Sequence, residues 1–234
     1  MMARALDLGT SFAATLARLG GGLSVGSIGH RPARPLELYE YENCPFCRKV
    51  RDALTMLDLE ALIQPCPKGG TRFRRTVRER GGREQFPWLV DPNTSVEMYE
   101  SADIVRYLYA TYGAGNPPFS LSPDLLATAS SSLASGFRPF AGTRVRASKA
   151  PEKPLELWSF EASPYCRLAR ETLSELELPY LLHNVAKGSP SRENFIARSG
   201  RMQVPFLFDP NTGRELFESA DIVAYLNLTY AQAD

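Results

Sequence analysis

The chain repeats itself, and this repeat restricts the possible folds more than any other feature of the sequence. Aligned from their leading prolines, residues 35–68 and 154–187 are identical at 14 of 34 positions. After a one-residue deletion, residues 85–113 and 203–231 are identical at 18 of 29 positions. Self-similarity over this length indicates two copies of one structural unit. We therefore expect two domains with the same fold.

Basic stretches rich in Ser, Ala, Gly and Pro flank these units. The predicted organisation is an N-terminal helical or targeting-like segment at 1–34, a first domain at 35–113, a basic connector with a short helix at 114–153 and a second domain at 154–234. Similar stretches, SFAATLARLGGG and SSSLASGFRPF, lie before the two repeats. Each domain is thus expected to bring a short leading helix. The composition of 1–34 also resembles a transit peptide, which favours the chloroplast over the alternative location, the cytoplasm.

Each repeat has the sequence pattern of a small α/β domain. The expected elements of the first repeat are, in order, a strand at 36–41, a helix from Pro45, a strand at 61–64, an Arg-rich helix at 71–80, strands at 87–91 and 96–99, and a helix with Ser101 as its N-cap. The second repeat follows the same order. A parallel βαβ unit followed by a helix, a hairpin and a helix predicts a mixed four-stranded sheet with helices on both faces.

The overall composition argues against two classes of partner. The formal net charge is +1, which gives no electrostatic reason to expect nucleic acid. No run reaches the roughly 18–20 apolar residues that span a bilayer, so we expect no transmembrane segment. Four cysteines, two of them in a Cys-x-x-Cys motif, are typical of redox or metal chemistry in a reducing compartment.

The motif Cys44-Pro45-Phe46-Cys47 joins the first strand of the first repeat to the helix that follows. The free N–H groups at a helix N-terminus favour a thiolate, and Arg48 and Lys49 add positive charge one turn further on. A thiolate with some exposure is the nucleophile of disulfide exchange. We expect Cys44 to be this nucleophile and Cys47 to attack a mixed disulfide formed on it.

Half of a zinc site is the alternative interpretation of this motif. A complete site needs a second pair of ligands. The remaining candidates, Cys66, Cys166, His30 and His183, do not have suitable spacing. We therefore favour redox chemistry and expect no metal site.

Two further motifs of the first repeat are candidates for ligand binding. Phe86-Pro87 precedes a strand, and a cis peptide bond there would expose the backbone of residue 86 to an extended peptide. Glu100-Ser101 stands at a helix N-terminus, where a hydroxyl and backbone N–H groups bind a carboxylate and Glu100 can pair with an ammonium group. The alternative for Glu100-Ser101 is simple helix capping. Together with the cysteine motif, the two sites predict a peptide ligand with an amine and a carboxylate.

Cys-Pro-Phe-Cys, an x-Pro before a strand, and Glu-Ser-Ala-Asp-Ile together resemble glutaredoxins and the N-terminal domain of glutathione S-transferases. The tandem arrangement is similar to thioredoxin-like proteins of plant and algal plastids and cyanobacteria. The resemblance covers 35–113 and 154–231, and it implies two thioredoxin-like domains with glutathione as co-substrate. It implies the following roles: Cys44 as nucleophile, Cys47 as resolving thiol, Phe86 and Pro87 at the cysteinyl part of glutathione, Glu100 and Ser101 at its γ-glutamyl end, and Lys68 at its glycyl carboxylate.

The second repeat departs from this pattern at the nucleophile. Its counterparts of the site residues are Ser163, Cys166, Val204, Pro205, Glu218 and Ser219. A serine hydroxyl cannot perform disulfide exchange, although it can hydrogen-bond a bound glutathione thiolate. We favour a domain that has kept its fold and lost its chemistry, with Cys166 buried as a small apolar residue.

These features predict an enzyme, a glutathione-dependent thiol–disulfide oxidoreductase acting through Cys44. In the transferases a large helical domain forms the pocket for the electrophile, and segment 114–153 is too short to be one, so conjugation is less favoured. The alternative is a binding or assembly module with a protein partner and a transferase-like glutathione site. A third hypothesis, an iron–sulfur centre held by Cys44 and glutathione between two chains, is disfavoured by Pro45 through the resemblance to glutaredoxins.

Overall fold

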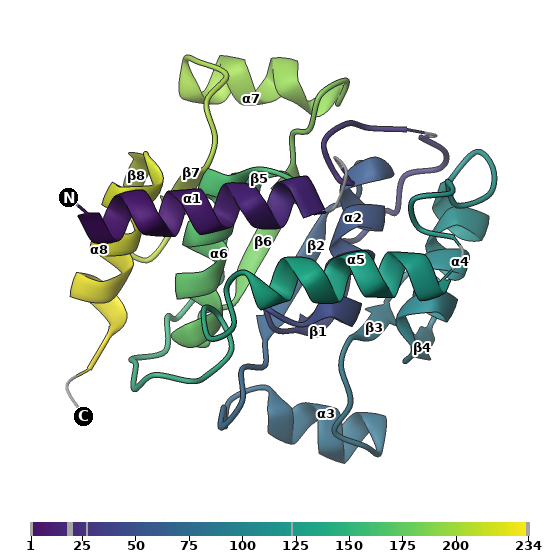
Figure 1. The fold of residues 1–234 in the computed structure, drawn as a ribbon, viewed down its shortest axis with the longest axis horizontal. Coiled ribbons are helices and arrows are strands. Elements are labelled where there is room, and N and C mark those ends of the chain that lie inside the picture. The colour runs from purple at the N-terminus through teal and green to yellow at the C-terminus, as the bar shows by residue number, and fades with distance from the viewer. Residues whose placement is uncertain (1, 18–20, 27, 123, 233–234) are drawn as a thin grey trace.

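The computed structural model describes residues 2–17, 21–26, 28–122 and 124–232 (Figure 1). The helices are α1 (Met2–Ala17), α2 (Pro45–Met56), α3 (Arg74–Gly81), α4 (Ser101–Tyr112), α5 (Asp124–Gly136), α6 (Pro164–Glu175), α7 (Ser191–Ser199) and α8 (Ser219–Tyr230). The strands are β1 (Leu36–Glu40), β2 (Ala61–Pro65), β3 (Trp88–Asp91), β4 (Val96–Met98), β5 (Leu155–Ser159), β6 (Tyr180–Asn184), β7 (Phe206–Asp209) and β8 (Arg214–Phe217). Both repeats therefore have the predicted order of elements, and the predicted thioredoxin-like fold class is confirmed.

The strands form one sheet of eight rather than two separate sheets of four. Its order is β4-β3-β1-β2-β6-β5-β7-β8, with β1 parallel to β2 and β5 parallel to β6. The repeats join where β2 and β6 pair antiparallel, with Ala61 opposite Leu182 and Ile63 opposite Tyr180. An unpaired edge strand exposes backbone N–H and C=O groups, and this pairing satisfies one such edge from each repeat.

Apolar side chains cover both faces of this sheet, because successive strand residues point to opposite sides. On one face, Leu38 and Leu157 belong to a continuous core that includes residues of α2, α4, α6 and α8. On the other face there are two smaller clusters, one under α3 around Trp88 and one under α7 around Trp158. The core thus runs uninterrupted through both repeats.

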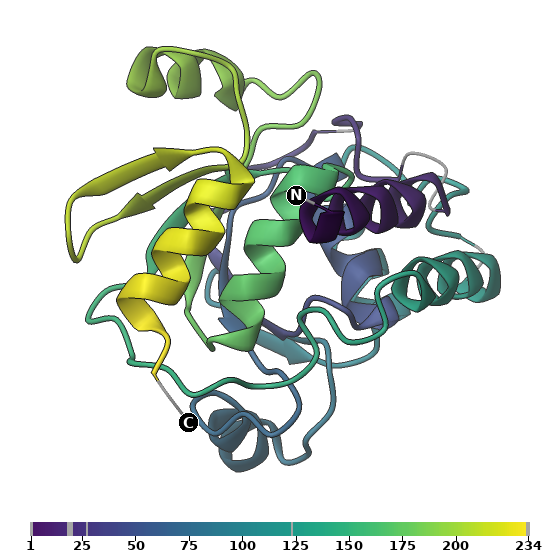
Figure 2. The ribbon, with the colours of Figure 1, turned by 60° about the vertical axis from the view of Figure 1, so that its left-hand side comes forward.

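The leading helices cross over between the repeats. Helix α1 precedes the first repeat but packs on α6 of the second, where Ser11 Oγ donates to the Pro164 carbonyl over 2.8 Å and Thr15 Oγ1 to the Ala162 carbonyl over 2.9 Å. Helix α5 precedes the second repeat but packs on α2 of the first, where Ser135 Oγ donates to the Asn43 carbonyl over 2.8 Å. Figure 2 shows α1 (purple) and α5 (teal) side by side, with α6 and α2 next to them. The chloroplast location suggested by the composition of residues 1–34 stays a prediction.

The chain that follows each leading helix repeats this exchange. Ser24 bridges to Lys187 of the second repeat, and Arg144 bridges in the same way to Lys68 of the first. Each connector then returns to its own repeat, through bridges from Ile28 to Gly113 and from Ser148 to Ala231. The two halves of the chain are therefore related by an approximate two-fold axis that includes the connectors.

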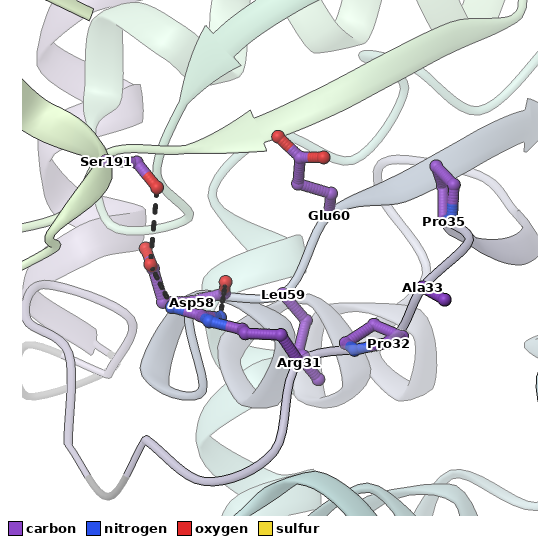
Figure 3. Close-up of a pocket in the computed structure, with 8 residues that line it drawn as sticks. All are labelled: Arg31, Pro32, Ala33, Pro35, Asp58, Leu59, Glu60 and Ser191. Carbon is purple, nitrogen blue, oxygen red and sulfur yellow. Dashed lines mark hydrogen bonds and ion pairs between the residues drawn. The ribbon is translucent and has the colours of Figure 1, made fainter. Parts of the chain in front are cut away.

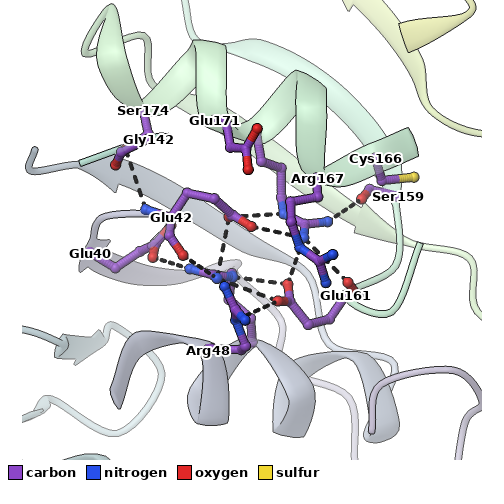
Figure 4. Close-up of polar contacts among 12 residues, drawn as sticks. Glu40, Glu42, Arg48, Gly142, Ser159, Glu161, Cys166, Arg167, Glu171 and Ser174 are labelled. Atoms are coloured by element: carbon purple, nitrogen blue, oxygen red, sulfur yellow. Dashed lines mark hydrogen bonds and ion pairs between the residues drawn. The ribbon is translucent and has the colours of Figure 1, made fainter. Parts of the chain in front are cut away.

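Buried ion pairs link the halves under the same two-fold relation (Figure 4). Arg51 of α2 donates from Nε to Glu161 Oε2 over 2.9 Å, and Arg170 of α6 donates from Nε to Glu42 Oε2 over 3.0 Å. All four side chains are almost fully buried. Arg51 also pairs with Glu40. Each repeat thus supplies one counter-ion to the other repeat's buried arginine, in addition to Glu42 for Arg51 and Glu161 for Arg170 within the same repeat.

An acidic residue after each repeat's first helix makes a second reciprocal link. Asp58 pairs with Arg31 and lies 3.5 Å from Ser191 Oγ of the second repeat. Its counterpart Glu177 accepts from the backbone N–H groups of Thr71 and Arg72, both over 3.2 Å. A small pocket of about 240 Å³ lies beside Asp58 (Figure 3). Its polar side chains are already engaged, Arg31 and Ser191 with Asp58 and Glu60 with His183.

Candidate functional site

Cys44 occupies the N-cap of α2, as the sequence predicts. Its backbone is extended, with φ −69° and ψ 121°, and Pro45 takes the first helical position. The backbone N–H of Cys47 donates to Cys44 Sγ over 3.4 Å. Because this N–H has no partner within the helix, it is available to stabilise a thiolate at Cys44.

The two cysteines of the motif have opposite acidities. Burial alone would raise the pKa of Cys44, but hydrogen bonds from Cys47 and Phe46 and the positive charge of Arg51 lower it from 9.0 to about 7. The pKa of Cys47 is raised well above its usual value by burial, by its hydrogen bond with Cys44 and by the negative charges of Cys44 and Glu40. Cys44 is therefore the thiolate of the pair and Cys47 the protonated thiol.

The Cys44 thiol is less accessible than disulfide exchange leads one to expect. Cys44 is 3% exposed and Cys47 is fully buried, whereas Phe46 between them is 46% exposed. Helix α5 packs along α2, and its Ser135 donates a hydrogen bond to the carbonyl of Asn43, the residue before Cys44. The sequence motif did not indicate this covering, because α5 belongs to a distant connector.

Phe86-Pro87 lies next to the cysteine motif, and its peptide bond is cis. The ring of Tyr41, three residues before Cys44, meets the Phe86 ring edge-on with centroids 6.2 Å apart. The Arg74 guanidinium stands 4.7 Å from the Phe86 centroid on another side. Tyr41 and Phe86 thus bring two segments, 45 residues apart in the sequence, to one place.

Arg74 is a site residue that sequence reasoning missed. Its Nε donates to the Pro67 carbonyl over 2.7 Å and its Nη2 to the Cys66 carbonyl over 3.0 Å. Only 13% of its side chain is exposed, so it is a fixed cation beside Phe86. In the sequence it is one of several arginines in the Arg-rich run at 71–80, and nothing in that run sets it apart. Its spacing from Phe86 carries no signal, because the contact is between a helix and a loop.

Lys68 lies in the same loop as the carbonyl groups that hold Arg74. Its side chain is exposed, and its backbone pairs with the connector at Arg144. Cys66, two residues earlier, is fully buried beneath α3. The loop therefore carries one cation, Lys68, in solvent, and its carbonyl groups fix a second, Arg74, at the start of α3.

Glu100 and Ser101 follow the hairpin at the start of α4. Gln85, next to Phe86, donates from Nε2 to Glu100 Oε1 over 2.7 Å, so this element adjoins the cis-proline loop. The expectation that Ser101 is the N-cap was wrong by one position. Ser101 is the first helical residue, and Glu100 is the N-cap without a side-chain capping bond.

The backbone of Glu100 is unusual. Its φ of 65° is rare for a residue with a Cβ atom, and Glu218 in the second repeat has a φ of 62°. Such conformations cost free energy and concentrate where proteins bind ligands. The same strained turn in both repeats is therefore consistent with a binding element inherited from one ancestor.

The second repeat has the same framework around a different chemical group. Ser163 is the N-cap of α6, and its Oγ accepts from the Cys166 N–H over 3.2 Å. Cys166 is fully buried, and the Val204-Pro205 bond is cis. Glu218 accepts from Gln203, and Ser219 again begins the helix. The second site therefore has the binding geometry of the first with a hydroxyl in place of the thiolate.

Across the described ranges, no group of three or more His, Cys, Asp and Glu side chains is arranged to hold a metal ion. Among the described helices, none has the length and apolar character needed to cross a membrane.

Comparisons with known proteins identify the family. A family model described as glutathione S-transferase, N-terminal domain, matches residues 38–118 and again residues 157–233. No curated protein sequence matches the chain. Two solved structures are similar in part. The Bombyx mori glutathione transferase BmGSTD1 has 24% identity and a TM-score of 0.33, over 37% of this chain and 39% of that one.

The second is Leishmania TDR1, described as a unique trimeric glutathione transferase. It has 16% identity and a TM-score of 0.31, over 86% of this chain and 68% of that one. Because both TM-scores are low, the assignment rests on the sequence match, which covers most of both repeats. The protein belongs to the glutathione S-transferase N-terminal domain family and contains two copies of that domain.

Proposed function

We propose that the protein is a glutathione-dependent thiol–disulfide oxidoreductase that acts through Cys44. The observation that carries this proposal is the division of acidity within the motif: a Cys44 pKa of about 7 beside a Cys47 pKa well above 9. An attacking thiol with a pKa near the ambient pH combines thiolate population with nucleophilicity. A protonated, buried Cys47 does not compete for the substrate.

The reaction begins with the Cys44 thiolate attacking the glutathionyl sulfur of a mixed disulfide. A bond forms between Cys44 and glutathione, the old disulfide bond breaks, and the substrate leaves as a thiolate that takes a proton from water. A second glutathione, as thiolate, then attacks the glutathionyl sulfur on Cys44. Oxidised glutathione leaves and the Cys44 thiolate is regenerated. In the other branch Cys47 loses its proton to the departing glutathione and forms a disulfide with Cys44.

The binding roles in this proposal follow the family resemblance and the positions of the side chains. Phe86 and Pro87 receive the cysteinyl part of glutathione beside the Cys44 turn. Glu100 and Ser101 receive the γ-glutamyl end, where α4 presents its free N–H groups. Lys68 receives the glycyl carboxylate, and Arg74 adds a fixed positive charge on that side. Since Cys44 is only 3% exposed, the chain around it must open for the substrate to enter.

Turnover of a glutathione mixed disulfide tests the proposal, measured on the full chain with reduced glutathione as the reductant. Wild type should turn over, and Cys44→Ser should lose the activity. Cys166→Ser is the matched control, because Cys166 is the counterpart of Cys47 in the repeat without a nucleophile, and it should leave the rate unchanged. Equally slow turnover by wild type and Cys44→Ser would refute the proposed enzymatic activity.

The second candidate is a binding or assembly module. The observation in its favour is the cover over Cys44 together with a second site that holds a serine. This candidate predicts glutathione binding with no turnover and no dependence on Cys44. Calorimetric titration of glutathione into wild type and Cys44→Ser, next to the turnover assay, separates the two functions.

A further inference from the structure

A pocket of about 430 Å³ lies between α6 and α8 of the second repeat, away from the cysteine motif. Its wall is apolar, formed by Leu168 of α6 and by Val223 and Ala224 of α8. Its rim includes Asp7 of α1 and Arg138 from the turn after α5. The volume falls within the roughly 300–1,000 Å³ of typical small-molecule sites.

Two sequence differences between the repeats fall at this groove. Leu168 occupies the position that Lys49 has in the first repeat, and Ala224 occupies the position of Arg106. In the first repeat the Lys49 Nζ reaches Thr128 of α5 over 3.0 Å, and Arg106 pairs with Asp103. The second repeat has therefore exchanged two long cationic side chains for two shorter apolar ones at this groove.

The polar end of the pocket is rich in carboxylates. Glu171 is buried and binds Arg138 through both oxygens, over 2.5 and 2.6 Å. Arg138 also donates to the Asp7 carbonyl and to Thr10 Oγ1, so its donors are engaged within the protein. Glu175 accepts from the Gly142 N–H over 2.9 Å, and Arg146 lies 3.4 Å from its other oxygen.

The charges at this end leave a negative balance. Three carboxylates, those of Asp7, Glu171 and Glu175, meet two guanidinium groups, Arg138 on Glu171 and Asp7 and Arg146 on Glu175, so one net negative charge remains. A carboxylate keeps free lone pairs after one hydrogen bond, and these accept from a ligand donor. The end of the pocket is thus suited to a cationic or strongly donating head group.

We infer that this pocket binds a small amphipathic amine. An aromatic or branched aliphatic group packs against Leu168, Val223 and Ala224, and the ammonium group points to Asp7 and Glu175. The site does not involve Cys44, so this inference stands apart from the proposed oxidoreductase activity. It gives the second repeat a binding role of its own, in place of the thiol chemistry that Ser163 cannot perform.

Three probes that share one ring and differ in head group test the inference by calorimetric titration into the full chain. They are 2-phenylethylamine, 2-phenylethanol and 3-phenylpropanoate. The amine should bind at least about tenfold more tightly than the alcohol, which corresponds to about 1.4 kcal/mol, and the carboxylate should not bind. Equal affinity for amine and carboxylate, or no binding of the amine, would overturn the inference.

Ala224→Arg restores the residue type of the first repeat and should abolish amine binding. Ala224 is exposed, so the fold should tolerate the change. The matched control is Leu228→Arg, one turn further along α8 outside the pocket, where the side chain is 88% exposed. Asp7→Asn provides a second test, because it should weaken the binding of the amine severalfold and leave the affinity for the alcohol unchanged. Loss of binding in both arginine variants, or in neither, would contradict the assignment.

Discussion

Cys44 and Cys47 stand three residues apart in one helix turn, yet the protein gives them opposite protonation states. The difference comes from position: Cys44 meets free helix N–H groups, and Cys47 lies inside the helix near two negative charges. One of these charges is Glu40, whose own pKa burial raises to about 7 against the lowering effect of Arg51. Glu40 and Cys44 are thus two coupled acids that titrate in the same pH range.

Glu40→Gln should lower the pH midpoint of Cys44 alkylation relative to the same protein with Glu40 in place. The reason is electrostatic, because removing a buried carboxylate removes a negative charge that opposes the thiolate. The measurement is the rate at which iodoacetamide modifies Cys44 as a function of pH. Every variant carries Cys47→Ser and Cys66→Ser, so that these two thiols do not react. Glu37→Gln, on the opposite face of the same strand, is the control and should not move the midpoint. An upward shift for Glu40→Gln would show that Glu40 does not act by charge.

The site residues that the sequence predicts are those that belong to local motifs. The position of Cys44 at a helix start and of Pro87 before a strand follows from neighbours in the chain, and the structure has both. Arg74 and Tyr41 were missed because their contacts with Phe86 bridge segments far apart in sequence. The N-cap of α4 was misplaced by one residue because the positive φ at Glu100 is a property of the folded turn.

At the scale of elements, the leading helices decide how the repeats fit together. Their existence could be predicted from the similar stretches before each repeat, but their placement could not. Ser11, Thr15 and Ser135 are ordinary small polar residues in the sequence. Their role in fixing the helices is visible only from their backbone acceptors, which lie in the second repeat for α1 and in the first repeat for α5. Helix crossing depends on tertiary packing rather than on local propensity.

Ser135→Ala should loosen α5 and speed the modification of Cys44. The lost hydrogen bond to the Asn43 carbonyl is worth about 1 kcal/mol, which corresponds to about a fivefold change in an opening equilibrium. The measurement is the alkylation rate of Cys44 in native protein. Thr15→Ala removes the matching bond on α1 and serves as the control, with no change expected at Cys44. Equal acceleration by both variants would mean that general destabilisation is responsible.

At the scale of the whole molecule, the two repeats form a single structural unit. They share one sheet, one continuous core and the reciprocal pairs Arg51–Glu161 and Arg170–Glu42. The repeat pattern predicts both domains but not this junction. Charged residues in the alignment, such as Glu42 and Glu161, carry the sequence signature of surface positions. Their burial depends on the partner repeat, which a local pattern does not contain.

Arg170→Met should destabilise the protein by about 3–5 kcal/mol, because it removes the guanidinium that binds both oxygens of buried Glu42 and leaves that carboxylate only Arg51, 3.3 Å away. The measurement is urea unfolding followed by circular dichroism. A second variant, Arg170→Met with Glu42→Leu, should recover most of the loss, since it removes both charges. One cooperative transition is expected in each case. Two separate transitions in wild type would contradict the single unit.

Acid should weaken the junction between about pH 4.5 and pH 2. Burial alone would raise the pKa of Glu161, but Arg170 and Arg51 lower it to about 2. A depressed carboxyl pKa contributes stability that is complete above the unfolded value and is lost as the pH falls toward the folded value. Unfolding free energies at pH 5, 4 and 3 measure the slope. Glu161→Gln should make that slope shallower. An unchanged slope would rule out protonation of Glu161 as the cause of the loss of stability.

The crossing of the leading helices has a consequence for how such a protein can change over generations. A deletion of the second repeat also removes α6, on which α1 packs. A deletion of the first repeat removes α2, on which α5 packs. Selection for the thiol of one half therefore acts on the scaffold of the other. The half that lacks a nucleophile cannot be discarded, and its surface is the part of the molecule where new specificity can arise without loss of the old chemistry.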